Sequence, residues 1–107
     1  MSDIIKIATQ IIRNEVEKAG YHILRIILFG SRAKKQEHPD SDWDFFVIID
    51  REIDRETKWD VILKIKRQLS KLKVPNDIII EPLSQIEQKK EDISSISYYA
   101  IREGITL

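Results

Sequence analysis

The sequence contains no cysteine, only three glycines and three prolines, and no excess of charge of either sign. Without cysteine, the 107-residue chain can form neither a disulfide nor a thiolate metal site. Its 18 basic and 18 acidic residues give no overall electrostatic reason to bind nucleic acid or a membrane surface. A nucleotide needs only a local site, so the neutral balance does not exclude one.

Long apolar runs are also missing, and no stretch approaches the ~20 residues of a membrane-spanning helix. The segment Met1–Ile4 lacks a basic region followed by an apolar run, so we expect no signal peptide and take the cytoplasm as the default location. The 42% hydrophobic content is typical of a folded protein. We expect one domain spanning residues 1–107.

The sequence does contain alternating helical and extended patterns. Apolar residues recur at helical spacing in four segments that we expect to form helices: 3–19, 54–72, 83–89 and 93–103. Runs rich in isoleucine and valine predict three strands: 22–29, 42–49 and 77–81. The fold class is therefore α/β (α+β), a small mixed β-sheet flanked by helices, whose first two strands are antiparallel because their connection is too short for a helical crossover.

Gly30 and Ser31 directly follow the first expected strand. Glycine permits a sharp turn and the close approach of a ligand. Ser31 adds an amide and a hydroxyl, which suit phosphate oxygens if a helical turn begins there. Read alone, Gly-Ser after a strand is an ordinary turn.

The segment Asp42-Trp43-Asp44 opens the second expected strand. Strand residues two apart point to the same face, so the carboxylates of Asp42 and Asp44 lie side by side, roughly 6–7 Å apart, with Trp43 directed into the core. Their repulsion costs about 2–3 kcal/mol at an effective dielectric constant near 20. A divalent cation removes this repulsion and prefers oxygen ligands of this type. The alternative is a solvated strand start.

Asp77 begins the third expected strand and completes an acidic cluster if that strand lies beside the second. Glu81 has the same parity but sits at the far end of the strand. A turn residue is the ordinary alternative for Asp77. Together, the Gly-Ser turn and the acids predict a nucleotide site in which two metal ions bridge phosphates to carboxylates for in-line displacement at phosphorus.

The spacing of these residues resembles the hallmark of the DNA polymerase β nucleotidyltransferase superfamily. Gly30-Ser31 is followed after ten residues by Asp42-Trp43-Asp44, within the strings FGSRA and PDSDWD. Those strings, and the AIREG segment at Ala100–Gly104, are similar to the minimal nucleotidyltransferases, which include the MntA-type antitoxins. The resemblance covers nearly the whole chain, and its spaced motif is far more specific than either part.

The resemblance implies a nucleotidyltransferase fold and transfer of AMP from ATP. It implies that Asp42 and Asp44 bind two Mg²⁺ ions and that Asp77 is the third acid, which joins them as a metal ligand and helps to activate the acceptor hydroxyl. Gly30, Ser31 and Arg32 are then the candidate nucleotide-binding residues, although a solvated surface charge is the ordinary alternative for Arg32. It also implies a helical HEPN-type toxin as partner, neutralised by addition of AMP to a tyrosine.

Three functions follow, of which an adenylyltransferase acting on a partner protein is the first. The expected single domain leaves no room for an acceptor-binding domain, so the acceptor pocket is expected from a partner or a dimer. The second is a nucleotidyltransferase acting on a small molecule such as an antibiotic. The third is an antitoxin that neutralises its partner by contact alone and needs neither Asp42 nor Asp44.

Overall fold

The computed structural model describes residues 3–34, 41–89 and 96–107. Its elements are, in order, α1 (Asp3–Lys18), β1 (Ile23–Phe29), β2 (Trp43–Ile49), α2 (Arg55–Lys71), β3 (Asn76–Pro82), α3 (Leu83–Lys89), α4 (Ile96–Glu103) and β4 (Ile105–Thr106). The expected helices and strands are confirmed to within a few residues, while β4 has no counterpart among them. Residues 35–40, between the first two expected strands, and the start of the last expected helix, 93–95, lie outside the described residues.

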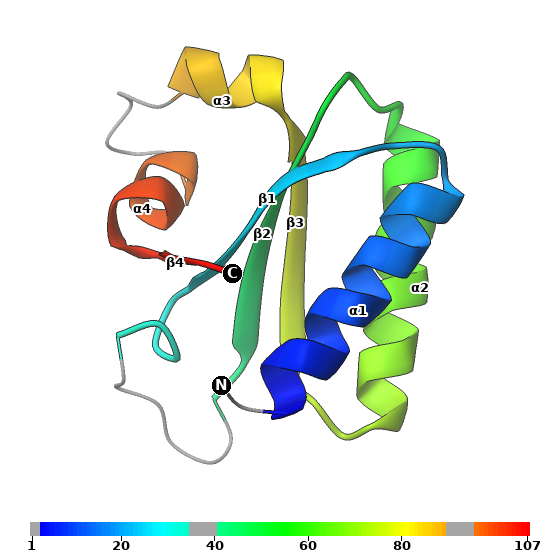
Figure 1. Ribbon diagram of the computed structural model, residues 1–107, viewed down its shortest axis with the longest axis vertical. Helices are drawn as coiled ribbons and strands as arrows, with labels where there is room; N and C mark the ends of the chain where they lie inside the picture. The colour runs from blue at the N-terminus through cyan, green and yellow to red at the C-terminus, as the bar shows by residue number, and fades with distance from the viewer. Residues whose placement is uncertain (1–2, 35–40, 90–95) are drawn as a thin grey trace.

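The strands form one four-stranded sheet in the order β3-β2-β1-β4. β1 is antiparallel to β2, and β2 is parallel to β3, so the predicted mixed sheet is confirmed. Figure 1 shows α1 and α2 on one side of the sheet and α3 and α4 on the other. Because β2 is an inner strand covered on both faces, its sequence is a nearly continuous apolar run.

Alternate residues of β2 divide between two apolar clusters, one on each face of the sheet. Trp43 and Phe45 belong to the larger cluster, which α1 and α2 cover, so the predicted inward orientation of Trp43 is confirmed. Phe46 and Ile48 belong to the smaller cluster, which includes Ala100 of α4. The strand parity therefore places Asp44 on the α3 and α4 face, opposite to Trp43.

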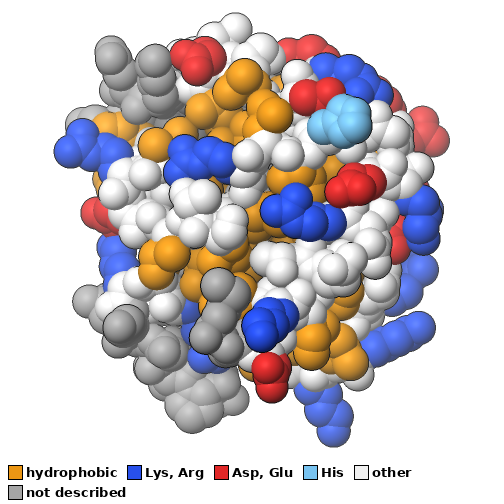
Figure 2. Space-filling model, viewed as in Figure 1, with side chains coloured by type: hydrophobic (Ala, Val, Ile, Leu, Met, Phe, Trp, Pro, Cys, Tyr) orange, Lys and Arg blue, Asp and Glu red, His pale blue; other side chains and the backbone are white. Residues whose placement is uncertain are grey.

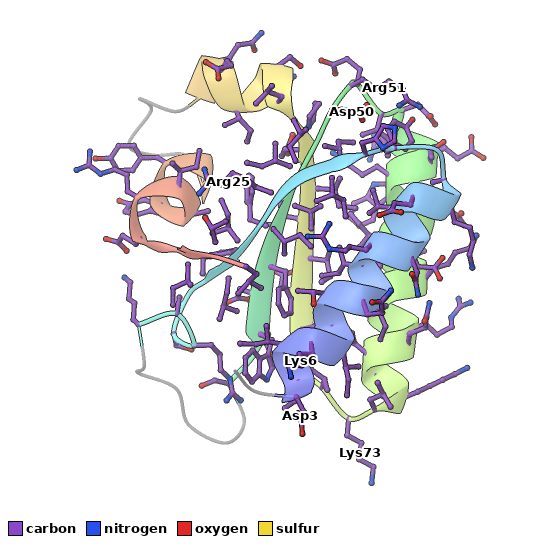
Figure 3. All side chains as sticks on the ribbon, viewed as in Figure 1. Asp3, Lys6, Arg25, Asp50, Arg51 and Lys73 are labelled. Carbon is purple, nitrogen blue, oxygen red and sulfur yellow. The ribbon has the colours of Figure 1, made fainter. Side chains whose placement is uncertain are left out.

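The end of α1 is tied to the end of β2. At Gly20, with φ of 94°, the helix closes in a Schellman motif: the Gly20 amide donates to Glu17 O (2.9 Å) and the Tyr21 amide to Val16 O (3.2 Å). Arg51, just after β2, donates to Gly20 O and lies 4.4 Å over the Tyr21 ring. In Figure 3, Arg51 lies at one end of the sheet and the first residues of α1 at the other.

α4 packs closely on β1 through Gly104. A Cβ at this position would overlap Ile27 Cγ2 and Ala100 O and would lie 2.9 Å from Leu28 O. Gly104→Ala is therefore expected to lower the free energy of unfolding by about 1–3 kcal/mol, since atoms forced into a packed contact displace their neighbours. Urea denaturation measures this loss. The control is the exposed change Arg102→Ala in α4, which should lower the free energy of unfolding by at most about 1 kcal/mol. Unchanged stability of Gly104→Ala would contradict the packing of α4.

Basic and acidic side chains are interspersed over the face drawn in Figure 2, with apolar side chains between them. This distribution agrees with the balanced composition of the chain. Of the helices in the described ranges, none combines the length and the apolar character needed to cross a bilayer.

Candidate functional site

Three segments meet at one end of the sheet. Because β1 and β2 are antiparallel, the end of β1 lies beside the start of β2, with Phe29 opposite Asp44. The Gly30–Lys34 turn leaves β1 at this end, and Asp42 directly precedes β2 there. Because β3 is parallel to β2, its start lies at the same end, with Asp77 opposite Asp44. The sheet thus brings together the turn and the three carboxylates that the sequence singled out.

Asp77, and not Glu81, lies beside the carboxylate pair. Asp77 is in register with Asp44, whereas Glu81 is paired with Ile48, four residues further along both strands. At ~3.3 Å per residue, this separation is about 13 Å. Asp44 and Asp77 have the strand parity of the cluster under α4, so both acids face the same side of the sheet.

The three carboxylates interact electrostatically. Burial is the largest cause of the raised pKa of Asp44, followed by repulsion from Asp77 and then from Asp42, while Lys66 opposes the rise. Asp44 is half-buried, and Asp42 and Asp77 are exposed. The predicted repulsion between acids is therefore present, and its larger part comes from the neighbouring strand.

Gly30 makes room for Asp44. A Cβ on Gly30 would overlap Asp44 Oδ2 and lie 3.2 Å from Asp44 Cγ, and the φ of 75° is one that L side chains rarely adopt. The amide of Lys34 donates to Gly30 O (3.3 Å) and closes a single turn over Ser31–Lys34. The half-buried carboxylate therefore lies directly against the backbone that the sequence predicts to receive phosphates.

Comparison with protein families shows which family the chain belongs to. The model of the family "Polymerase beta, Nucleotidyltransferase" matches residues 6–106. The chain belongs to this nucleotidyltransferase family. The match runs from α1 to β4, so the family fold accounts for every described element. No curated protein sequence matches the chain.

Solved structures share the fold of this nucleotidyltransferase. A chain of a toxin–antitoxin crystal structure with AMP-PNP is 19% identical, with a TM-score of 0.60, and the alignment covers 98% of this chain and 72% of that one. A mutant of the toxin–antitoxin MntA–HpeT gives 18% identity, a TM-score of 0.58 and coverages of 98% and 72%. The structure of a tri-AMPylated Shewanella oneidensis HEPN toxin in complex with an MNT antitoxin gives 16% identity and a TM-score of 0.51. That alignment covers 94% of this chain and 69% of the other. At such identities, the likeness establishes the fold.

The donor set of the nucleotidyltransferase fits Mg²⁺, which binds carboxylate oxygens. Within 3–34, 41–89 and 96–107, no group of three or more His, Cys, Asp and Glu side chains has the arrangement of a ready-made metal site. Mg²⁺ usually takes one or two carboxylates and completes its shell with water and substrate phosphates. Asp42 and Asp44 supply the two carboxylates that such a Mg²⁺ site needs.

The two basic residues of the turn already have partners in the structure. Arg32 donates to Ser41 O through Nη2 (2.9 Å) and Nε (3.3 Å), and its Cζ lies 4.4 Å over the Trp43 ring. Lys34 forms an ion pair with Glu103 of α4 (2.7 Å). The turn is thus joined to the start of β2 by Arg32 and to α4 by Lys34.

Lys66 of α2 is a site residue that the sequence did not single out. Its Nζ donates to Asn76 O (2.8 Å) and Asn76 Oδ1 (3.3 Å), and its charge opposes the rise in the Asp44 pKa. Lys66 therefore fixes the start of β3 and brings positive charge towards the acids. In the sequence it is one of many lysines on an amphipathic helix, and only the parallel pairing of β3 with β2 reveals its position.

Proposed function

We propose that this nucleotidyltransferase transfers AMP from ATP to a tyrosine hydroxyl of a HEPN-type toxin and so acts as its antitoxin. The observation that carries the proposal is the gathering of Asp42, Asp44 and Asp77 at an exposed end of the sheet, where Asp44 lies against Gly30. The choice of partner is supported by fold neighbours that are toxin–antitoxin complexes, one of which contains a tri-AMPylated HEPN toxin.

Each site residue has a role in the proposed reaction. The backbone and hydroxyl of Gly30–Ser31 bind the phosphates of ATP, and Asp42 and Asp44 would hold Mg²⁺, as two ions. When bound, the metal supplies charge stabilisation to the phosphates and lowers the pKa of a coordinated hydroxyl. The acceptor oxygen forms a bond to the α-phosphorus, the bond to the β-phosphate oxygen breaks, and pyrophosphate leaves. The hydroxyl proton passes to the Asp77 carboxylate.

The position of the acids favours a macromolecular acceptor. Asp42 and Asp77 are exposed at the end of the sheet, where a protruding side chain of another protein can reach them. Two cavities, of about 220 and 280 Å³, lie elsewhere; the first is between α1 and α2 and the second is lined by residues of the 70–75 segment. Neither of these two cavities is lined by a candidate catalytic carboxylate, and we place the acceptor site at the exposed acids, in the proposed complex of toxin and antitoxin.

Label transfer tests this function. The chain is incubated with Mg²⁺, the HEPN-type toxin encoded beside it, and ATP labelled at either the α- or the γ-phosphate. We expect the α-label, and not the γ-label, to appear on a toxin tyrosine, with release of pyrophosphate. Transfer to an aminoglycoside but not to the toxin would replace the protein acceptor by a small molecule. Neutralisation of the toxin that survives in Asp42→Asn/Asp44→Asn would assign antitoxin action to contact alone.

Removal of divalent cations is expected to abolish the transfer. Excess EDTA should lower the rate at least ~10²-fold, because the charge on the phosphates and on Asp42 and Asp44 is then not neutralised. Added Mg²⁺ or Mn²⁺ should restore it, whereas Na⁺ at the same ionic strength should not. The measurement is α-label incorporation over time, and full activity in EDTA would exclude the metal-dependent reaction.

A further inference from the structure

Arg32 joins the Gly30–Ser31 turn to the segment that carries Asp42 and Asp44. Its guanidinium donates twice to Ser41 O, at 2.9 and 3.3 Å, across a separation of nine residues in the sequence. The same group lies 4.4 Å over the ring of Trp43. Arg32 follows the Gly30–Ser31 turn directly, and Ser41 directly precedes Asp42. These contacts, which we call the Arg32 clip, therefore fix the phosphate turn relative to the carboxylate pair.

The clip holds the guanidinium away from the acids. Trp43 is only 8% exposed and belongs to the cluster under α1 and α2, whereas Asp44 has the parity of the opposite face. A planar guanidinium that stacks on an aromatic ring and donates a fork of hydrogen bonds is held in one orientation. To reach phosphates on the face of Asp44, Arg32 must give up these contacts.

We propose that Arg32 is a positioning residue for nucleotidyl transfer, which sets the separation between the Gly30–Ser31 turn and the pair Asp42 and Asp44, and is not a phosphate ligand. The proposal rests on the nucleotidyltransferase activity of the family and adds a residue role to it. A displacement of ~1 Å between groups that orient a substrate costs up to ~10² in rate, so a contact that fixes this separation has a large effect on turnover.

Two roles for Arg32 predict opposite results for Arg32→Lys. If Arg32 binds phosphate, lysine retains the charge and restores most of the affinity for ATP. If Arg32 acts through the Arg32 clip, lysine does not restore the activity. Its ammonium neither forms the planar fork of hydrogen bonds to Ser41 O nor stacks flat on Trp43. We therefore expect Arg32→Lys and Arg32→Gln to lower kcat similarly, ~10–100-fold, with KM for ATP changed less than ~3-fold.

Arg51 offers a matched control. Its guanidinium also lies 4.4 Å over an aromatic ring, that of Tyr21, and also donates to a backbone carbonyl, Gly20 O. It further forms an exposed ion pair with Asp50 (3.4 Å), which contributes little to stability. It stands at the far end of β2, as Figure 3 shows. Arg51→Gln removes contacts of the same kind, so it is expected to change stability as Arg32→Gln does while leaving kcat within ~2-fold of the wild type. If both variants lost the same amount of kcat, Arg32 would contribute to the stability of the fold and not to the positioning of the site.

A second variant tests the stacking partner. Trp43→Phe keeps an aromatic ring in the core but weakens the attraction to the guanidinium. It should lower kcat by less than Arg32→Gln does, and the double variant should be no worse than Arg32→Gln alone, since both changes break one clip. Additive losses in the double variant, a KM for ATP raised more than ~10-fold with kcat unchanged, or rescue by Arg32→Lys would each overturn the proposal.

Amide hydrogen exchange separates failure of the clip from failure of the proposed acceptor. In the protein without any acceptor, Arg32→Gln and Arg32→Lys should accelerate exchange at residues 30–34 and 41–44, whereas Arg51→Gln should accelerate it at 20–23. If the wild type transfers AMP to no toxin but the variants show this exchange pattern, the proposed acceptor is wrong and the Arg32 clip is supported. Unchanged exchange at 30–34 and 41–44 in both Arg32 variants would overturn the clip, whatever the activity.

Discussion

Asp44→Asn is expected to slow nucleotidyl transfer ~10²–10³-fold and, at the same time, to make the metal-free protein more stable. Removing one preorganised electrostatic group from a catalytic site typically lowers kcat by ~10²–10³-fold, and Asp44 lies at the centre of the three acids. Its stability effect has the opposite sign, because burial and the charges of Asp77 and Asp42 oppose its ionisation.

The pH dependence of this gain follows from linkage. The pKa of Asp44 is raised on folding, so the native state binds a proton more tightly than the unfolded chain, and ionised Asp44 lowers stability. The advantage of Asp44→Asn should therefore be full above the folded pKa and should vanish as the pH falls below the unfolded value of 3.8. Solvent screening around the exposed Asp42 and Asp77 limits the gain to about 1 kcal/mol, or roughly 4–8 °C in Tm.

Asp60→Asn is the matched control for this prediction. The side chain of Asp60 is 61% exposed on α2 and forms an ion pair with Lys64 (3.1 Å), so the same chemical change should leave both activity and stability nearly unchanged. Thermal unfolding is measured in EDTA and again with Mg²⁺, which should stabilise the wild type but not Asp44→Asn. Retained activity in Asp44→Asn, or a loss of stability at neutral pH, would contradict the assignment of Asp44.

Gly30→Ala is expected to have the second largest effect. The added Cβ overlaps Asp44 Oδ2, so the carboxylate must leave its position against the turn, and kcat should fall by at least ~10²-fold. The φ of 75° adds about 1–2 kcal/mol of backbone strain for an L side chain. Activity and urea denaturation are measured together, so that the displacement of the Asp44 carboxylate can be separated from the backbone strain.

Gly20→Ala separates them. Gly20 also has a positive φ, of 94°, but the nearest atom to its Cβ is Arg51 Nη2 at an ordinary 3.8 Å. Gly20→Ala should therefore lose about the same 1–2 kcal/mol of stability as Gly30→Ala while keeping its activity. If the two alanine variants retain equal activity, the close contact between Gly30 and Asp44 has no catalytic role.

Local pattern predicted most of the fold and the acids of the site. Helical spacing and isoleucine-rich runs gave the order of elements, and the short connection after Phe29 gave the antiparallel pairing of β1 and β2. The parity of a strand predicts Asp42 and Asp44 on one face; β2 begins at Trp43, so Asp42 directly precedes the strand and the shared face stays a prediction. The position of Asp77 followed once β3 was assumed to lie beside β2, which the register confirms.

Other features depend on contacts between distant segments, which a single sequence does not encode locally. β4 has only two residues and forms because the chain after α4 meets β1 at Ile27 and Leu28. The contact of Arg32 with Ser41 depends on how the chain returns from β1 to β2, and the position of Lys66 depends on the start of β3. The overlap that requires glycine at position 30 becomes visible only when Asp44 of the neighbouring strand is placed.

The central claim is that the end of the sheet formed by Gly30–Ser31, Asp42, Asp44 and Asp77 is the nucleotidyl transfer site. Its most direct test is a crystal structure with Mn²⁺ and a non-hydrolysable ATP analogue, with anomalous scattering used to locate the metal. We expect an anomalous peak within coordination distance of Asp42 and Asp44 and a triphosphate on the Gly30–Ser31 turn. Metal and nucleotide bound together at another part of the surface, with these carboxylates making no contact to either, would contradict it.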